Sequence, residues 1–233
     1  WLRVMLQKYL LLEGCLLEDM HDKFVLGNRE RQFVKFEHDQ SNWVPAPLKI
    51  DQLSFNANRY SDRRVIFLVR DPRDILVSSW YHLKFRESIY RGDLSTFIRD
   101  DLVGIRKVIA FMNMWIKNSQ VPREFLLLSY EEMHTDPIYS FERVLDFLRL
   151  EVDSRNLRIA VEESTFDKMK QMEKEGNLDE PWLLPGTKGE ERSMKVRRGR
   201  VGSYQEDLSS TDVAYLNQVI QRELSEELEQ YRY

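Results

Sequence analysis

The sequence contains a single cysteine, Cys15, in 233 residues. One thiol excludes an internal disulfide, and its place beside Leu16 and Leu17 favours a small core residue over a reactive group. Long apolar runs are also missing, because charged residues interrupt every run before it reaches the roughly 20 residues that span a bilayer. We therefore expect a cytoplasmic protein with no membrane segment in this chain.

No excess of charge of either sign points to a polyanionic partner. Lys and Arg number 35 against 39 Asp and Glu, a formal net charge of −4 that does not favour nucleic-acid binding. The histidines, the cysteine and the carboxylates show no metal-ligand spacing, so no metal site is expected. With 42% hydrophobic residues the chain can bury one core, and the default is a single domain over residues 1–233.

The chain begins at Trp1 without an initiator methionine, and apolar residues recur at helical spacing from Leu2 to Leu10. This pattern predicts a start in mid-domain, so we expect an N-terminally incomplete domain. A targeting segment upstream would lie outside this sequence.

Strand-like and helical patterns alternate along the chain. Arg64–Val69 is a continuous apolar run, typical of a central strand that is covered on both faces, and Arg123–Tyr130 is a second run of this type. Arg31–Asp39 also has the length and composition of a strand. A long helix is expected over Leu94–Asn118, with Leu102 on its apolar stripe. The β-α-β-α order predicts an α/β fold with a parallel sheet flanked by helices.

The second half of the chain carries helical patterns and one long polar connection. Pro137 opens a helix, no convincing strand follows residue 151, and Ser210 with Thr211 opens a final amphipathic helix. Residues 181–200 mix glycine, proline and many charges. Such a long loop in a compact domain is usually functional or mobile.

Arg70 stands directly after the first buried run, where a parallel sheet places its ligands. Asp71 fits the N-cap of the next helix and Pro72 its first residue, so a guanidinium, backbone N–H groups and a helix N-terminus meet there, which suits a phosphate. Ser78 adds a hydroxyl. The alternative is structural: Asp71 and Asp74 cap the helix and pair with the neighbouring arginines.

Three further segments carry candidate residues. In the segment Val196–Ser209, Gly199 lets the backbone approach an anion, and Arg197 with Arg198 supplies charge. Alternatively, this is a solvated basic run or a localisation signal. Tyr130 ends the second buried run, where a buried tyrosine is common. The stretch STFDKMKQ from Ser164, taken alone, is a plain helix start.

These four segments, in this order, resemble the sulfotransferases that use 3′-phosphoadenosine 5′-phosphosulfate (PAPS). The resemblance implies the P-loop NTPase-like sulfotransferase fold, with PAPS as cofactor and 3′-phosphoadenosine 5′-phosphate (PAP) as product. It implies two sets of nucleotide contacts. The 3′-phosphate ligands are Arg70, Ser78, Arg197, Arg198 and Gly199, and the residues at the adenine are Trp1, Tyr130, Ser164 and Phe166, with Met169 as support.

The family also has a histidine at the end of the strand before the phosphate segment, which here is His38. A neutral imidazole, with an unperturbed pKa of about 6.5, can accept the acceptor's proton at physiological pH. Glu37 is the second candidate, and strand alternation places it on the opposite face from His38. The chain departs from the pattern at Phe36, where the family often has a lysine; Lys35 is adjacent but alternates to the other face.

A second departure concerns the phosphate loop with its lysine, which would precede Trp1 and is absent from this sequence. We expect upstream residues to supply it, and we expect in-line transfer without a metal. Two alternatives are a small-molecule kinase of related fold and a non-catalytic adenine-nucleotide-binding module. The acceptor is expected to be a small molecule of apolar or aromatic character, and the oligomeric state stays open. The aromatic residues that suit either an acceptor pocket or the core are Trp43, Phe55, Trp80, Tyr81, Phe85 and Trp182.

Overall fold

The computed structural model describes residues 1–14, 23–25, 33–41, 48–176, 186 and 190–233. They form two compact units, one made of Trp1–His38 with Glu132–Leu183 and the other of Asp39–Glu131 with Leu184–Tyr233. None of the helices in these stretches is long and apolar enough to cross a membrane. The expectation of one domain over the whole chain stays a prediction.

The first unit is mainly helical. Its opening helix is confirmed as α1, and the hydroxyl of its buried Tyr9 donates to the backbone oxygen of Glu151 at 2.7 Å and accepts from the backbone N–H of Asp153 at 3.0 Å. These two bonds join α1 to the start of α8. The helices of this unit, with α6 continuing into it from the second unit, are α1 (Leu2–Leu12), α6 (Tyr130–Thr135), α7 (Pro137–Phe147), α8 (Ser154–Glu162) and α9 (Phe166–Glu175).

The strand expected over Arg31–Asp39 is present as a shorter element. It is β2 (Phe33–Lys35), and it pairs antiparallel with β1 (Lys23–Val25), with Phe24 opposite Val34. Among the described residues, these two strands form a separate two-stranded sheet. Their pairing is antiparallel because a short connection does not permit parallel pairing. Residues 36–38 therefore follow the strand, and alternation does not fix the directions of Glu37 and His38.

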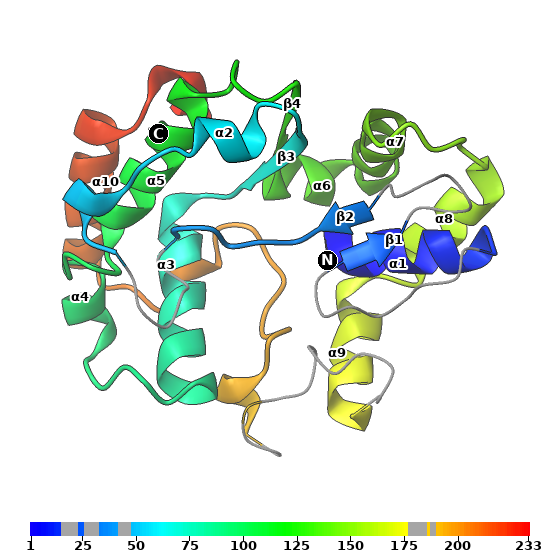
Figure 1. Cartoon of the computed structure of the whole chain (residues 1–233). Coiled ribbons are helices and arrows are strands. Elements are labelled where there is room, and N and C mark those ends of the chain that lie inside the picture. Colours follow the sequence, from blue (N-terminus) through cyan, green and yellow to red (C-terminus); the bar gives the residue numbers. More distant parts are fainter. Residues whose placement is uncertain (15–22, 26–32, 42–47, 177–185, 187–189) are drawn as a thin grey trace. The chain divides into compact units, whose positions relative to one another are not determined.

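The second unit contains the parallel sheet that the sequence predicts. Strand β3 (Arg64–Val69) pairs in parallel with β4 (Glu124–Ser129), in a register that sets Arg64 opposite Glu124 and Val69 opposite Ser129. Helices flank this sheet, and α5 packs on both α3 and α10 (Figure 1). The helical elements of this unit are η1 (Ile50–Gln52), α2 (Ala57–Tyr60), α3 (Pro72–Tyr81), the π-helical turn η2 (His82–Arg86), α4 (Leu94–Phe97), α5 (Ile105–Lys117), η4 (Glu191–Ser193), η5 (Ser203–Glu206), α10 (Ser210–Glu223) and η6 (Glu226–Tyr231).

The core of the second unit lies where the sheet meets α5. The indole of Trp115 stacks on Phe67 of β3 at 5.5 Å and meets the rings of Phe55 and Tyr60 edge-on at 5.1 and 4.9 Å. Aromatic pairs of this kind bury large areas in preferred geometries. The other face of β3 is less covered than the sequence predicts, since Leu68 is 45% exposed.

The long helix expected over Leu94–Asn118 is two helices. The chain leaves α4 after residue 97 and starts α5 at residue 105, and Leu102 of the expected stripe is 37% exposed. Gly104 permits the break, because a Cβ atom there would lie 2.5 Å from the backbone oxygen of Asp100 and 2.7 Å from that of Ile98. The turn thus depends on the absence of a side chain at one residue.

We expect Gly104→Ala to lower the free energy of unfolding by about 1–3 kcal/mol, because the added methyl group must push two backbone carbonyls apart. Urea denaturation followed by circular dichroism measures this change. Gln120→Ala, at an exposed site beyond α5, is the control and should change stability by less than about 0.5 kcal/mol. Equal stabilities of the two variants would contradict the steric account.

Candidate functional site

The turn from β3 to α3 has the local structure that the sequence predicts. Asp71 is the N-cap, its carboxylate accepting from the backbone N–H of Arg73 at 2.8 Å, and Pro72 is the first helical residue. The same carboxylate binds the guanidinium of Arg73 through two bonds of 2.8 Å. Arg73 is 4% exposed and also donates to Asn217 of α10 and to the backbone oxygen of Tyr231. This pair therefore fastens the helix start to the C-terminal elements.

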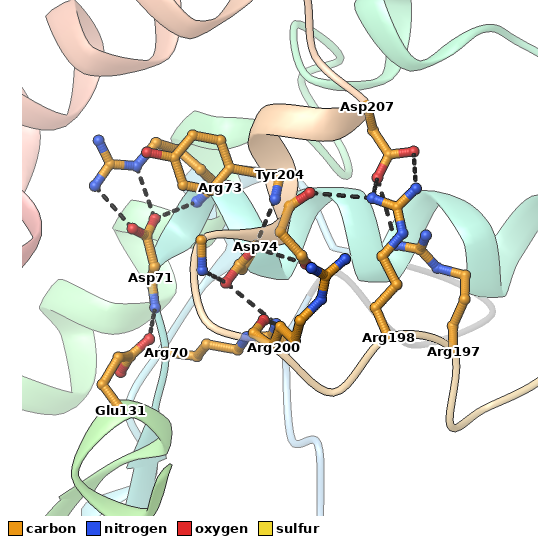
Figure 2. A network of polar contacts seen from close by, with 12 residues as sticks. Arg70, Asp71, Arg73, Asp74, Glu131, Arg197, Arg198, Arg200, Tyr204 and Asp207 are labelled. Atoms are coloured by element: carbon orange, nitrogen blue, oxygen red, sulfur yellow. Dashed lines mark hydrogen bonds and ion pairs between the residues drawn. The ribbon is translucent and has the colours of Figure 1, made fainter. Parts of the chain in front are cut away.

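Asp74, in the first turn of α3, holds the segment around Gly202 and Tyr204. Its carboxylate is 1% exposed and accepts from the backbone N–H groups of Gly202 and Tyr204 at 2.9 and 3.0 Å (Figure 2). The Ser203 hydroxyl adds a bond of 3.2 Å. Gly202 has φ +72°, a left-handed conformation that favours glycine. The sequence predicts Asp74 as an acidic residue of the first helical turn that pairs with a neighbouring arginine, but it does not show the bonds to the segment around Gly202.

Arg70 is directed to the same segment. Its guanidinium lies 3.2 Å from the Asp74 carboxylate and donates to the backbone oxygen of Arg200 at 3.2 Å. The alternative expected from the sequence, arginines paired with Asp71 and Asp74, is thus present. Arg70 also lies over the ring of Tyr130 at 4.3 Å, a cation–π contact. Burial raises the pKa of Tyr130, whereas the nearby charge of Arg70 opposes that rise.

The two arginines of the basic segment, Arg197 and Arg198, both lie close to the carboxylate of Asp207. Arg198 binds Asp207 through bonds of 2.6 and 3.2 Å and donates to the backbone oxygen of Ser203 at 3.1 Å. The guanidinium of Arg197 stands 3.6 Å from the same carboxylate and 3.7 Å from the centre of the Tyr81 ring. Gly199 follows with φ +60°, so the chain turns sharply after the arginines.

Arg197 is the least compensated of these cations. It makes no hydrogen bond with another residue that the structure describes, although only 15% of its side chain is exposed. Burial lowers the pKa of Arg197, and the charges of Arg198 and Arg70 lower it further, against the opposing effect of Asp207. The strand-end arginine and both arginines of the basic segment therefore share one electrostatic environment, as an anion site requires.

Ser78 lies on α3 and is partly exposed, and its hydroxyl makes no hydrogen bond with another described residue. Six of the sequence-predicted residues thus belong to the second unit: Arg70, Ser78, Tyr130, Arg197, Arg198 and Gly199. The contacts bring Arg70, Tyr130 and the basic segment together.

The other four predicted residues, Trp1, His38, Ser164 and Phe166, belong to the first unit. Trp1 has its ring 4.9 Å from that of His134. Ser164 is fully buried and its hydroxyl has no hydrogen-bond partner among the described residues, while Phe166 begins α9. His38 is exposed, three residues after β2.

The candidate base Glu37 has a partner, because its carboxylate forms an ion pair with Lys35. Lys35 was the residue considered in place of the family's lysine near the histidine. Glu37, the alternative base, and Lys35, the alternative lysine, are thus paired with each other. Whether His38 or Glu37 is the base stays a prediction.

Three contributors to this site have no signal in the sequence. Tyr81 donates its hydroxyl to Asp207 at 2.9 Å, and Glu131 accepts from the backbone N–H of Asp71 at 3.0 Å and from the hydroxyl of Tyr231 at 2.7 Å. Tyr81 was considered as a lining of an acceptor pocket or as core. In the sequence Asp207 and Glu131 are ordinary charged residues, because no local pattern shows the bonds that they accept from Tyr81 and Tyr231.

The aromatic residues considered for an acceptor pocket divide into three groups. Phe55 packs on the Trp115 core. Trp80, Tyr81 and Phe85 form a cluster on α3 and η2, with the centre of the Trp80 ring 4.9 Å from that of Tyr81 and 5.3 Å from that of Phe85. Trp43 and Trp182 lie outside the described residues.

A model of the sulfotransferase domain matches residues 48–229. The chain belongs to the sulfotransferase family. It is 24% identical over 210 residues to sulfotransferase 2A6 of Rattus norvegicus, covering 80% of this chain and 72% of that protein. It is also 24% identical over 185 residues to sulfotransferase 2A1 of Macaca fascicularis, covering 77% and 62%. The family resemblance seen in the sequence is confirmed.

Solved structures show the same fold. A crystal structure of retinol dehydratase in complex with androsterone and inactive cofactor PAP matches with a TM-score of 0.56 and 22% identity, over 70% of this chain and 48% of that chain. The α/β fold with a parallel sheet flanked by helices is confirmed. The sulfotransferase chain described here spans between about half and three quarters of the length of these relatives.

We expect Asp74→Asn to lower the free energy of unfolding by about 3 kcal/mol, because one backbone N–H then faces an amide NH₂ and Arg70 loses its buried partner. Amide exchange at Gly202 and Tyr204, combined with urea denaturation, measures the effect. Asp101→Asn, at an exposed site, is the matched control. Unchanged protection of both amides would show that Asp74 does not hold this segment.

Proposed function

We propose that this chain transfers the sulfuryl group of PAPS to a hydroxyl or amine of a small-molecule acceptor. The observation that carries the proposal is the buried guanidinium of Arg197, which lacks a hydrogen bond among the described residues and shares its environment with Arg70 and Arg198. A desolvated cation in such a cluster favours a bound dianion. Membership of the sulfotransferase family supports the choice of this nucleotide.

The residues present fit a 3′-phosphorylated adenine nucleotide. Guanidinium groups are the donors best suited to phosphate, and Gly199 at φ +60° allows the backbone to come close to it. The proposed 3′-phosphate ligands are Arg70, Ser78, Arg197, Arg198 and Gly199. When bound, PAPS supplies the sulfuryl group.

The residues that the family resemblance implies at the adenine stay proposals taken one by one: Tyr130, Trp1, Ser164 and Phe166. Ser164 supports this assignment, because a fully buried hydroxyl without a partner among the described residues costs free energy unless a ligand satisfies it. Tyr130 offers an aromatic ring, and the guanidinium of Arg70 lies over this ring.

We assign the general base to His38. The imidazole is exposed to solvent, so the charged form that it takes on accepting a proton keeps contact with water, and histidine is a side chain suited to general-base catalysis near neutral pH. Glu37 is the weaker candidate because its carboxylate is engaged in an ion pair with Lys35. The role of His38 is to remove the acceptor proton as the acceptor oxygen or nitrogen attacks.

The acceptor we propose is a small molecule with apolar or aromatic character, acted on in the cytoplasm. The relative of known structure contains androsterone, an apolar ligand, alongside PAP. In this chain the Trp80, Tyr81 and Phe85 cluster lies next to Arg197, since Tyr81 contacts that guanidinium. Apolar surface beside a charged nucleotide site suits an apolar acceptor.

Titration calorimetry with PAP tests the nucleotide site. We expect Arg197→Ala to weaken binding by about tenfold or more, because the phosphate loses charge-assisted hydrogen bonds. Arg200→Ala removes the same charge from an exposed side chain that pairs with Glu206, and it should change affinity by less than about threefold. Equal losses would show a general effect of charge, and no binding by the wild type would refute the nucleotide assignment.

The base is tested by separating binding from turnover. With PAPS and a panel of phenolic and steroidal alcohols, His38→Ala should lower kcat by about a hundredfold or more while the affinity for PAP stays within about twofold. Glu37→Gln is the control and should retain most of the activity. The reverse pattern would assign the base to Glu37.

A further inference from the structure

Asp207 stands at the centre of the proposed anion site, although no part of the family resemblance points to it. It follows η5, and its side chain is 9% exposed. One carboxylate oxygen accepts from Arg198 at 2.6 Å, and the other accepts from Arg198 at 3.2 Å and from the Tyr81 hydroxyl at 2.9 Å. Figure 2 shows the guanidinium groups of Arg197 and Arg198 next to each other and both directed to this carboxylate.

The two arginines differ in what remains available to a ligand. Arg198 directs both ends of its planar fork to Asp207 and further contacts the Ser203 backbone and Glu206, so most of its donors are engaged. Arg197 approaches Asp207 only to 3.6 Å, beyond hydrogen-bond distance. Its donors stay available while its plane rests against the Tyr81 ring at 3.7 Å.

Tyr81 contacts both Arg197 and Asp207. Its ring supports Arg197, and its hydroxyl donates to Asp207. Burial, and then the hydrogen bond to Asp207, raises the pKa of Tyr81, so the phenol keeps its proton and stays a donor at neutral pH. Ring, carboxylate and the two guanidinium groups thus form one connected structure, and moving Asp207 moves both arginines.

We propose that Asp207, together with Tyr81, is the positioning residue of the 3′-phosphate site, holding Arg198 in a fixed fork and presenting Arg197 to the phosphate. This inference rests on the proposed function, since it assigns a role within that nucleotide site. Asp207 does not contact the phosphate in this account. It acts by reducing the number of orientations that Arg197 and Arg198 adopt before the nucleotide binds.

The direction in which Asp207→Asn changes the affinity for PAP separates positioning from a simple effect of charge. Removing a negative charge beside an anion site strengthens anion binding if only the field matters. If Asp207 positions the arginines, Asp207→Asn weakens binding instead, because an amide NH₂ meets one end of the Arg198 fork. Glu206→Gln is the matched control, because Glu206 is the neighbouring residue and also contacts Arg198, at 3.2 Å, but it is 48% exposed.

The experiment is calorimetric titration of the full chain with PAP and with adenosine 5′-phosphate, which lacks the 3′-phosphate. We expect Asp207→Asn to weaken PAP binding by about tenfold or more and Tyr81→Phe by about threefold, with adenosine 5′-phosphate affected by less than about twofold. Glu206→Gln should bind PAP as tightly as the wild type or slightly more tightly. The selective loss is a result that general damage to the fold does not produce.

Other outcomes overturn the inference. PAP binding by folded Asp207→Asn that equals or exceeds that of the wild type refutes positioning, as does an equal loss for both nucleotides. If Asp207→Asn fails to fold, Tyr81→Phe decides, because it keeps the ring under Arg197 and removes only the hydroxyl. A wild type that binds neither nucleotide refutes the proposed function itself, whereas tight wild-type binding with unaffected variants refutes only the role of Asp207.

Discussion

The buried carboxylate of Asp74 is the interaction on which the arrangement of the second unit depends. It lies in the first turn of α3 and accepts from the backbone N–H groups of Gly202 and Tyr204, which fixes the end of the basic segment beside the end of β3. Because the same carboxylate lies 3.2 Å from Arg70, one anion both anchors the segment and orients the strand-end arginine. Together with the bond from Tyr81 to Asp207, this anchor positions the arginines of the basic segment against α3.

Carboxylates and guanidinium groups alternate through the site, so most of its cations are compensated by a neighbouring anion. Asp71 neutralises Arg73, Asp74 faces Arg70, and Asp207 binds Arg198. Each pair removes the cost of burying a lone charge. Arg197 is the exception, and the incomplete compensation of this partly buried cation is the reason why we propose an anion as its ligand.

Local features of the fold could be predicted from the sequence, and distant pairings could not. The run Arg64–Val69 followed by Asp71 and Pro72 defines a strand, an N-cap and a helix start within a few residues, so periodicity and capping chemistry suffice. The break at Gly104 was missed because an apolar stripe continues across it, and only the approach of the Asp100 backbone reveals the constraint. The pairing of β2 with β1 was likewise not visible, since three residues carry too little pattern.

In the candidate site, too, local features could be predicted from the sequence and distant pairings could not. Arginines at a strand end and in a glycine-containing segment are recognisable by type and by resemblance, because their chemistry is local. The role of Asp207, and the bonds of Asp74 to distant backbone, are recognisable only through their partners, since Asp74 meets Gly202 across 128 positions of sequence. A motif thus identifies the groups that face the ligand, whereas the carboxylates that hold them are identified only after folding.

Supporting carboxylates have a consequence for selectivity. Asp74, Asp207 and Glu206 reduce the field that any approaching anion experiences, so attraction at long range is weaker than a group of arginines alone would give. What they provide instead is geometry, because forks held in place match the oxygens of one phosphate better than those of a smaller or differently placed anion. If the proposed nucleotide site is right, such an arrangement distinguishes nucleotides by the position of their phosphate more than by their total charge.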